Sequence, residues 1–256
     1  MTGKAGGLAQ LARAFGWQPK GQGFDSPNLH QFHLKYYIIN KSLDRYIRNL
    51  ILQGENQHLD FKFEISDAKK IARTFSAFAN TEGGKLLVGV KDNGAIAGIR
   101  TDEEVYMIES AAHLFCKPKV DYILKPWQLD GKTILEVTIG ESMQKPHEAP
   151  WKDNLWRAFV RVKDENFLAN SIQVEVWKKQ RAGKGVLVKY NRQEKELLEF
   201  LRLNNEITMS DFCRLCKIKY PVAKRILVNL VAIGVIVIVF DEKTAKYQLN
   251  PSQKDC

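Results

Sequence analysis

The chain has 256 residues, of which 45% are hydrophobic and 27% are charged. This composition is typical of a globular protein and excludes collagen-like, mucin-like and wholly disordered chains. The longest apolar run, Val235–Phe240, is far shorter than the roughly 18–20 residues that a membrane span needs, so we expect no membrane partner. Four cysteines are too few for a disulfide scaffold and favour a cytoplasmic location.

The first segment, Gly6–Gln31, resembles a transfer-RNA gene translated in frame. The codons permitted by Gly6–Leu8 and Asn28–Gln31 supply complementary acceptor strands, and those of Phe15–Lys20 supply an anticodon arm. We therefore expect residues 1–37 to be a non-native or disordered extension, produced by a start site that is assigned too early. An amphipathic, acid-poor targeting presequence is the alternative.

The next segments alternate between helical and strand periodicity. Residues 42–53 place apolar side chains three and four positions apart, which predicts an amphipathic helix. Leu59–Ile65 alternates between apolar and polar residues, as a strand does. Asp67 is then placed to cap a helix over Ala68–Ala79.

A hairpin is predicted where Leu86–Val90 and Ile96–Ile99 flank the turn sequence Asp92-Asn93-Gly94. One more helix and three more strands are expected at residues 102–115, 120–126, 134–139 and 158–162. Because helices and strands follow one another in a mixed order, we expect residues 40–177 to form an α+β domain around one mixed sheet.

The last third of the chain carries the basic surplus. Residues 178–256 hold 16 basic and 8 acidic residues, whereas residues 36–177 hold 19 and 20. This asymmetry favours a polyanionic partner such as nucleic acid, and a lysine-rich surface that only contacts solvent is the alternative. We expect DNA rather than RNA as the partner, with a homodimer as one assembly to test.

A glycine- and lysine-rich stretch at residues 178–190 predicts a linker. Three helices and a β-hairpin are expected after it, at residues 192–203, 208–216, 220–233 and 235–249. This order is that of a winged helix-turn-helix, which we predict over residues 191–250, followed by a tail at 251–256.

In a winged helix the third helix enters the DNA groove and the hairpin, or wing, touches the DNA backbone. The residues expected to contact nucleic acid are Lys219, Tyr220, Lys224, Arg225, Asn229, Lys243 and Lys246. A winged helix that binds another protein chain is the alternative.

The middle region carries a specific motif, in which Ser-Ala-Phe-Ala-Asn80 precedes Thr-Glu-Gly83-Gly84-Lys-Leu-Leu-Val-Gly89-Val. With Glu55–Lys62 before it and two later segments, this motif resembles the Schlafen AlbA-2 domain family, also called the divergent AAA-4 family, over about residues 50–172. Bacterial proteins that are similar commonly join this domain to a C-terminal winged helix. They are labelled transcriptional regulators or ATP-binding proteins, so the resemblance implies these functions.

The corner of this motif offers a candidate nucleotide- or phosphate-binding site. The residues are Asn80, Gly83, Gly84 and Lys85, because glycine amides and a lysine can approach a phosphate closely. A purely structural helix-to-strand connection is the alternative. The sequence has no G-x-x-x-x-G-K-[ST] motif, so ATP enters only through the family label.

Three acids provide an enzymatic alternative. Some Schlafen proteins act as metal-dependent endoribonucleases. The resemblance to them implies catalytic, metal-binding acids in this chain at Glu55, Asp60 and Asp92. Clustered acids can hold Mg²⁺ or Mn²⁺, which activates water, although Asp60 is one methylene shorter than the glutamate of the family. The preferred interpretation is a DNA-binding transcriptional regulator that is not an enzyme. The alternatives are such an endoribonuclease and an ATP-binding or protein-interaction adaptor.

Overall fold

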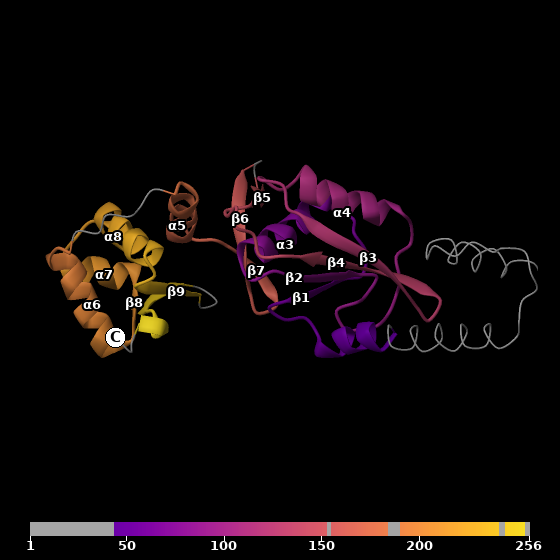
Figure 1. Ribbon diagram of the computed structural model, residues 1–256, viewed down its shortest axis with the longest axis horizontal. Helices are drawn as coiled ribbons and strands as arrows, with labels where there is room; N and C mark the ends of the chain where they lie inside the picture. The colour runs from indigo at the N-terminus through magenta and orange to yellow at the C-terminus, as the bar shows by residue number, and fades with distance from the viewer. Residues whose placement is uncertain (1–43, 153–154, 184–189, 241–243, 254–256) are drawn as a thin grey trace, which may run out of the picture. The chain divides into compact units, whose positions relative to one another are not determined.

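Figure 1 shows the computed structural model, which describes residues 44–152, 155–183, 190–240 and 244–253. The expected extension at residues 1–37 and the candidate DNA contact Lys243 lie outside the described residues. Residues 44–53 are helical, within the segment where the apolar stripe predicts a helix. In the ranges that the structure describes, no helix combines the length and apolar character needed to cross a membrane.

A mixed four-stranded sheet forms the centre of the first region. Its strands are β1 (Leu59–Lys62), β2 (Gly84–Val88), β3 (Tyr122–Leu129) and β4 (Lys132–Ile139), in the order β1-β2-β4-β3. β1 and β2 are parallel, and the other two pairs are antiparallel. A parallel pair needs a crossover connection, which α3 (Ala68–Asn80) supplies, and α4 (Glu103–His113) follows β2. The predicted α+β class with a mixed sheet is confirmed.

The hairpin predicted after β2 is short. Besides the antiparallel bridge between Val90 and Ile96, Lys91 N donates to Ala95 O at 3.0 Å and Ala97 N donates to Gly89 O at 2.8 Å. Gly98, with φ +77°, then bends the chain, and Ile99 N donates to Thr133 O at 2.8 Å. The second half of the hairpin therefore pairs with the residues after β2 over a few positions and then bonds to β4.

A second, three-stranded antiparallel sheet packs against α3 (Figure 1). It consists of β5 (Glu148–Pro150), β6 (Trp156–Val162) and β7 (Glu165–Leu168), in that order. α3 contacts this sheet and also β4, so one core connects the helix with both sheets. Its largest fully buried side chains are Phe75, Phe78, Leu86, Ile108, Ile139 and Phe159.

The C-terminal region has a core of its own. Its elements are α5 (Ser171–Arg181), α6 (Arg192–Asn204), β8 (Glu206–Thr208), α7 (Met209–Cys216), α8 (Tyr220–Ala232), β9 (Ile236–Phe240), β10 (Ala245–Leu249) and a 3-10 turn at Pro251–Gln253. The three strands form an antiparallel sheet in the order β8-β10-β9. The helices and the sheet share one buried cluster that includes Leu197, Phe212, Leu227 and Tyr247.

α5 corrects the linker expected at residues 178–190. Lys178–Arg181 form the last turn of this helix, and Ile172 and Val176 are buried in the C-terminal cluster. Basic side chains in the last turn of a helix are stabilised by the helix dipole, so these residues favour a helix end as much as a linker. The domain boundary expected at residue 177 therefore falls inside a helix.

Candidate functional site

α3 ends in a tight corner, where the segment after Asn80 brings three elements together. The helix ends at Asn80, and Gly83 follows with φ +74°. A Cβ on Gly83 would lie only 2.7 Å from Ile139 O, and a Cβ on Gly84 would overlap the buried Phe78 ring. The two glycines therefore allow the end of α3 to approach β2 and β4 closely.

Asn80 is only 2% exposed, and its side-chain amide is fully hydrogen-bonded. Nδ2 donates to His147 O at 2.8 Å, to Phe159 O at 3.0 Å and to Ser76 Oγ at 3.2 Å. Oδ1 accepts from His147 N at 2.7 Å. The amide therefore joins the end of α3 to β6 and to the residue that precedes β5.

Lys85 is also held within the fold. Its Nζ donates to Glu136 Oε1 at 2.5 Å and to Thr138 Oγ1 at 3.2 Å, while Trp127 Nε1 donates to Glu136 Oε2 at 2.8 Å. Glu136 is 3% exposed, and a buried carboxylate needs such partners. These contacts correct the prediction of a phosphate-binding corner, because the polar side chains of Asn80 and Lys85 bind protein groups and both glycines are required by packing.

Glu55 and Asp60 lie together at β1. Asp60 is 3% exposed, and its Oδ1 lies 3.2 Å from Lys62 Nζ and 3.4 Å from Arg161 Nη2. Glu55 Oε1 accepts from Phe61 N at 2.8 Å and lies 3.9 Å from Lys62 Nζ. Burial and the neighbouring Asp60 carboxylate raise the pKa of Glu55. The cluster therefore combines two carboxylates with two cations, Lys62 and Arg161, so that protein groups balance its charge.

Asp92 does not join this cluster. Gly94 N donates to Lys91 O at 2.7 Å, closing a turn that leaves Asp92 exposed. Among the described residues, no three His, Cys, Asp or Glu side chains gather closely enough to hold a metal ion. The structure thus brings Glu55 and Asp60 together, as the resemblance implies, but the expected three-carboxylate site is not assembled.

Arg161 belongs to this cluster, although the sequence assigns it no function. Its guanidinium is almost fully buried and also donates to Leu59 O at 3.1 Å and to Asn166 Oδ1 at 3.2 Å. Arg161 and Asp60 are separated by 101 positions, so no local spacing predicts their contact. The one available signal is an arginine between Val160 and Val162 in the otherwise apolar second half of β6.

The exposed cations of the C-terminal region gather around the turn between α7 and α8. Lys217, with φ +53°, ends α7, Lys219 directly precedes α8, and Arg225 lies in the second turn of α8. All three are exposed, and none forms an ion pair with another described residue. Of the other described basic residues from 190 onwards, all except Arg202 are paired with carboxylates: Arg192, Lys195, Arg214, Lys224 and Lys246.

α5 packs alongside α8 and bonds to three of its polar side chains. The residue numbers of the paired side chains increase in the same order along both helices: Ser171 pairs with Tyr220, Glu175 with Lys224, and Lys179 with Asn229. Contacts in this order mean that the two helices run parallel.

This packing corrects the expectation that Lys224 and Asn229 are free to contact DNA. Lys224 is half-buried with Nζ 2.5 Å from Glu175 Oε1, and Asn229 is half-buried as the acceptor for Lys179. On the hairpin, Lys246 Nζ lies 2.6 Å from Glu206 Oε1.

Known proteins resemble part of the chain. Residues 55–170 match the family model described as Schlafen, AlbA_2. The DIP2311 protein from Corynebacterium diphtheriae has 22% identity and a TM-score of 0.39, over 57% of this chain and 32% of that one. The N-terminal domain of an ATP-dependent DNA helicase RecG-related protein from Nitrosomonas europaea has 21% identity and a TM-score of 0.34, over 49% of this chain and 95% of that one. The family model therefore supports the resemblance to the Schlafen AlbA-2 domain family over residues 55–170.

Proposed function

We propose that this protein binds duplex DNA through a winged helix formed by residues 191–250 and acts as a transcriptional regulator. Three helices, α6, α7 and α8, followed by the β9–β10 hairpin support the assignment, because this is the element order of that fold. α8 is then the helix that enters the major groove. The AlbA_2 domain at residues 55–170 supports a nucleic-acid-related role for the chain.

The observation that carries the proposal is the unpaired positive charge of Lys217, Lys219 and Arg225. The first residues of a groove-entering helix are the ones that reach the base edges, and all three cations lie at this end of α8. Lys217 and Lys219 contact phosphates, where each neutralised charge releases a condensed counterion. Arg225 can donate two hydrogen bonds to the major-groove edge of guanine.

α5 limits which side of α8 can reach DNA. Lys224 and Asn229 are held by α5, whereas Pro221, Val222 and Arg225 stay exposed on the N-terminal half of α8. The proposed contact surface is therefore narrower than the one expected from the sequence. It consists of the α7–α8 turn and one side of the first two turns of α8.

A charge-matched pair of variants tests the proposal. One variant combines Lys217→Ala, Lys219→Ala and Arg225→Ala. The control combines Arg192→Ala, Lys195→Ala and Arg202→Ala on α6, which removes the same net charge from the same region. Binding of both to a labelled DNA duplex is measured by fluorescence anisotropy at several salt concentrations.

The first variant is expected to bind DNA more weakly. Its slope of log K against log salt concentration should become shallower by about 2 to 3, since each phosphate contact contributes about 0.9. The control keeps the slope of the unmodified protein. Equal losses in both variants would show that only net charge matters, and an unchanged slope in the first variant would reject the assigned surface.

A further inference from the structure

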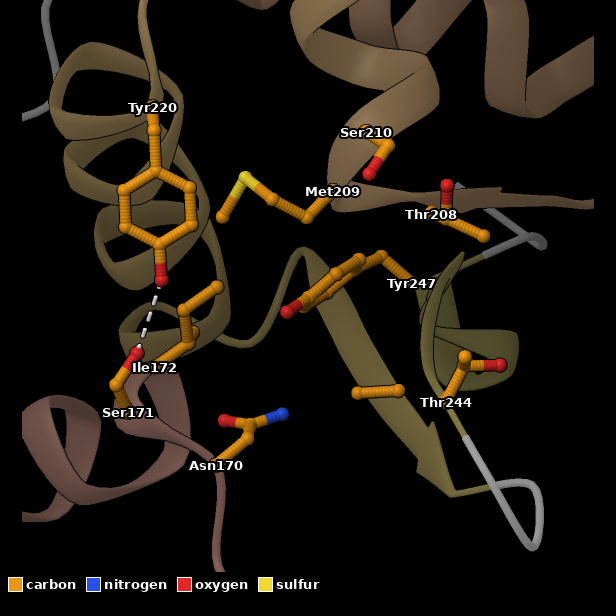
Figure 2. A pocket seen from close by; sticks show the side chains of 10 residues that line it. Asn170, Ser171, Ile172, Thr208, Met209, Ser210, Tyr220, Thr244 and Tyr247 are labelled. Atoms are coloured by element: carbon orange, nitrogen blue, oxygen red, sulfur yellow. Dashed lines mark hydrogen bonds between the residues drawn. The ribbon is translucent and has the colours of Figure 1, made fainter.

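A cavity of about 260 Å³ lies in the C-terminal region among α5, α7, α8 and β10 (Figure 2). Its volume approaches the lower end of small-molecule pockets, roughly 300 Å³. None of the ten residues that line it carries a charge. An occupant is therefore recognised by dipoles and hydrogen bonds.

Two donors that have no hydrogen-bond partner among the described residues face this space. Tyr247 is 2% exposed, its hydroxyl forms no hydrogen bond with another described residue, and Figure 2 shows the hydroxyl directed into the cavity. Burial raises the pKa of Tyr247, so the hydroxyl keeps its proton at neutral pH and can donate it. Asn170 Oδ1 caps α5 by accepting from Gln173 N at 2.7 Å, which leaves the buried Nδ2 without a partner. Buried donors of this kind are costly unless a ligand or water accepts from them.

Three helices begin at the cavity. Ser171 is the first residue of α5, Met209 that of α7 and Tyr220 that of α8, and all three line the space. The first N–H groups of a helix have no intrahelical acceptor, and the helix dipole is positive at this end. Together with the two unpartnered donors, these helix starts favour an anionic acceptor group.

The remainder of the lining is apolar and includes the side chains of Ile172, Met209 and Ala245. In Figure 2 the Met209 thioether lies between the rings of Tyr220 and Tyr247. A ligand that fits both the hydrogen-bond donors and the apolar lining has one anionic group and a compact apolar body.

We propose that this cavity binds a small organic anion, namely a carboxylate or a phosphate monoester with a compact apolar body. Its anionic oxygens accept hydrogen bonds from the Tyr247 hydroxyl and from Asn170 Nδ2, and its apolar body contacts Ile172 and Met209. An occupant bridges α5 to α7, α8 and β10. The site stands independently of the proposed DNA binding.

Three probes of similar shape test the proposal by isothermal titration calorimetry on the full chain. Benzoate and phenyl phosphate carry the two anionic groups on the same ring, and benzyl alcohol is the uncharged control. At least one of the anions is expected to bind, and the alcohol at least tenfold more weakly. The anion that binds more tightly distinguishes a carboxylate ligand from a phosphate ligand.

Two variants locate the binding. Tyr247→Phe removes one donor and should weaken anion binding about tenfold, the effect of one hydrogen bond to a charged acceptor. Tyr190→Phe is the matched control, because Tyr190 is 65% exposed and does not line the cavity. Asn170→Asp keeps an acceptor for Gln173 N but places a carboxylate at the site, so it should abolish anion binding even where Tyr247→Phe fails to fold.

The proposal is overturned if neither anion binds up to about 10 mM, a concentration that would detect even millimolar affinity. It is also overturned if benzyl alcohol binds as tightly as the anions, or if the variant proteins that fold bind as the unmodified chain does.

Discussion

Asn80→Ala should strongly destabilise the first region of the chain, because the Asn80 side-chain amide makes structural hydrogen bonds and no ligand contact. The substitution removes the acceptor of His147 N and the donors to His147 O and Phe159 O. Ser76 Oγ still donates to His147 O at 2.7 Å, so His147 N and Phe159 O are the groups that lose their side-chain partner. One such group costs about 1–3 kcal/mol, and each lost hydrogen bond adds about 0.5–1.5 kcal/mol. The expected loss is about 3 kcal/mol.

Urea unfolding followed by tryptophan fluorescence measures this loss, which corresponds to a decrease of about 1 M in the midpoint. Asn80→Asp has nearly the same shape, but it turns carboxylate oxygens toward the carbonyls of His147 and Phe159, so it should be at least as destabilising. Asn204→Ala, at the exposed end of α6, is the matched control and should change stability by less than about 0.5 kcal/mol. A loss below about 1 kcal/mol in Asn80→Ala would refute the structural role.

Three more predictions follow from buried or paired groups. Gly84→Ala should cost about 1–3 kcal/mol because its methyl group overlaps a buried ring, whereas Gly140→Ala, with no atom within 4 Å of the added Cβ, should be neutral in the same urea assay. Burial lowers the pKa of His147, so the unfolded chain binds this proton more readily, and stability should fall as pH decreases through about 6.5. His147→Gln should remove that part of the pH dependence of stability, and an unchanged pH dependence in this variant would contradict the assignment to His147. Glu175→Gln should free Lys224 from its ion pair with α5, so DNA should bind more tightly and the salt slope should steepen by about 0.9. Weaker binding would contradict the interpretation that Glu175 keeps Lys224 away from DNA.

Local periodicity and caps predict most of the elements because they report which face of an element is buried. The helix predicted over Ala68–Ala79 ends one residue later in the structure, and Asp67 caps it by accepting from Lys69 N as expected. α5 is not predicted, because its basic last turn and the following glycine have the composition of a linker. The apolar residues that bury it, Ile172 and Val176, pack against elements that lie much later in the chain.

Contacts between residues far apart in the chain also limit the prediction of the candidate sites. Glu55 and Asp60 are expected together from the family resemblance, and they lie close because only a short turn, with a bridge between Asn56 and Leu59, separates them. Their partner Arg161 comes from β6, and such a long-range ion pair has no local signal. The pairing of Lys224 is likewise invisible in the sequence, because helical spacing predicts which side of a helix faces solvent but not which helix covers it.

Amide hydrogen exchange of the full chain, with and without duplex DNA, tests the central claim most directly, because it locates the contact without any substitution. Bound DNA should produce new protection in a segment centred on residues 217–225, at the α7–α8 turn and the start of α8. Protection confined to residues 55–170, or to α6, would contradict it.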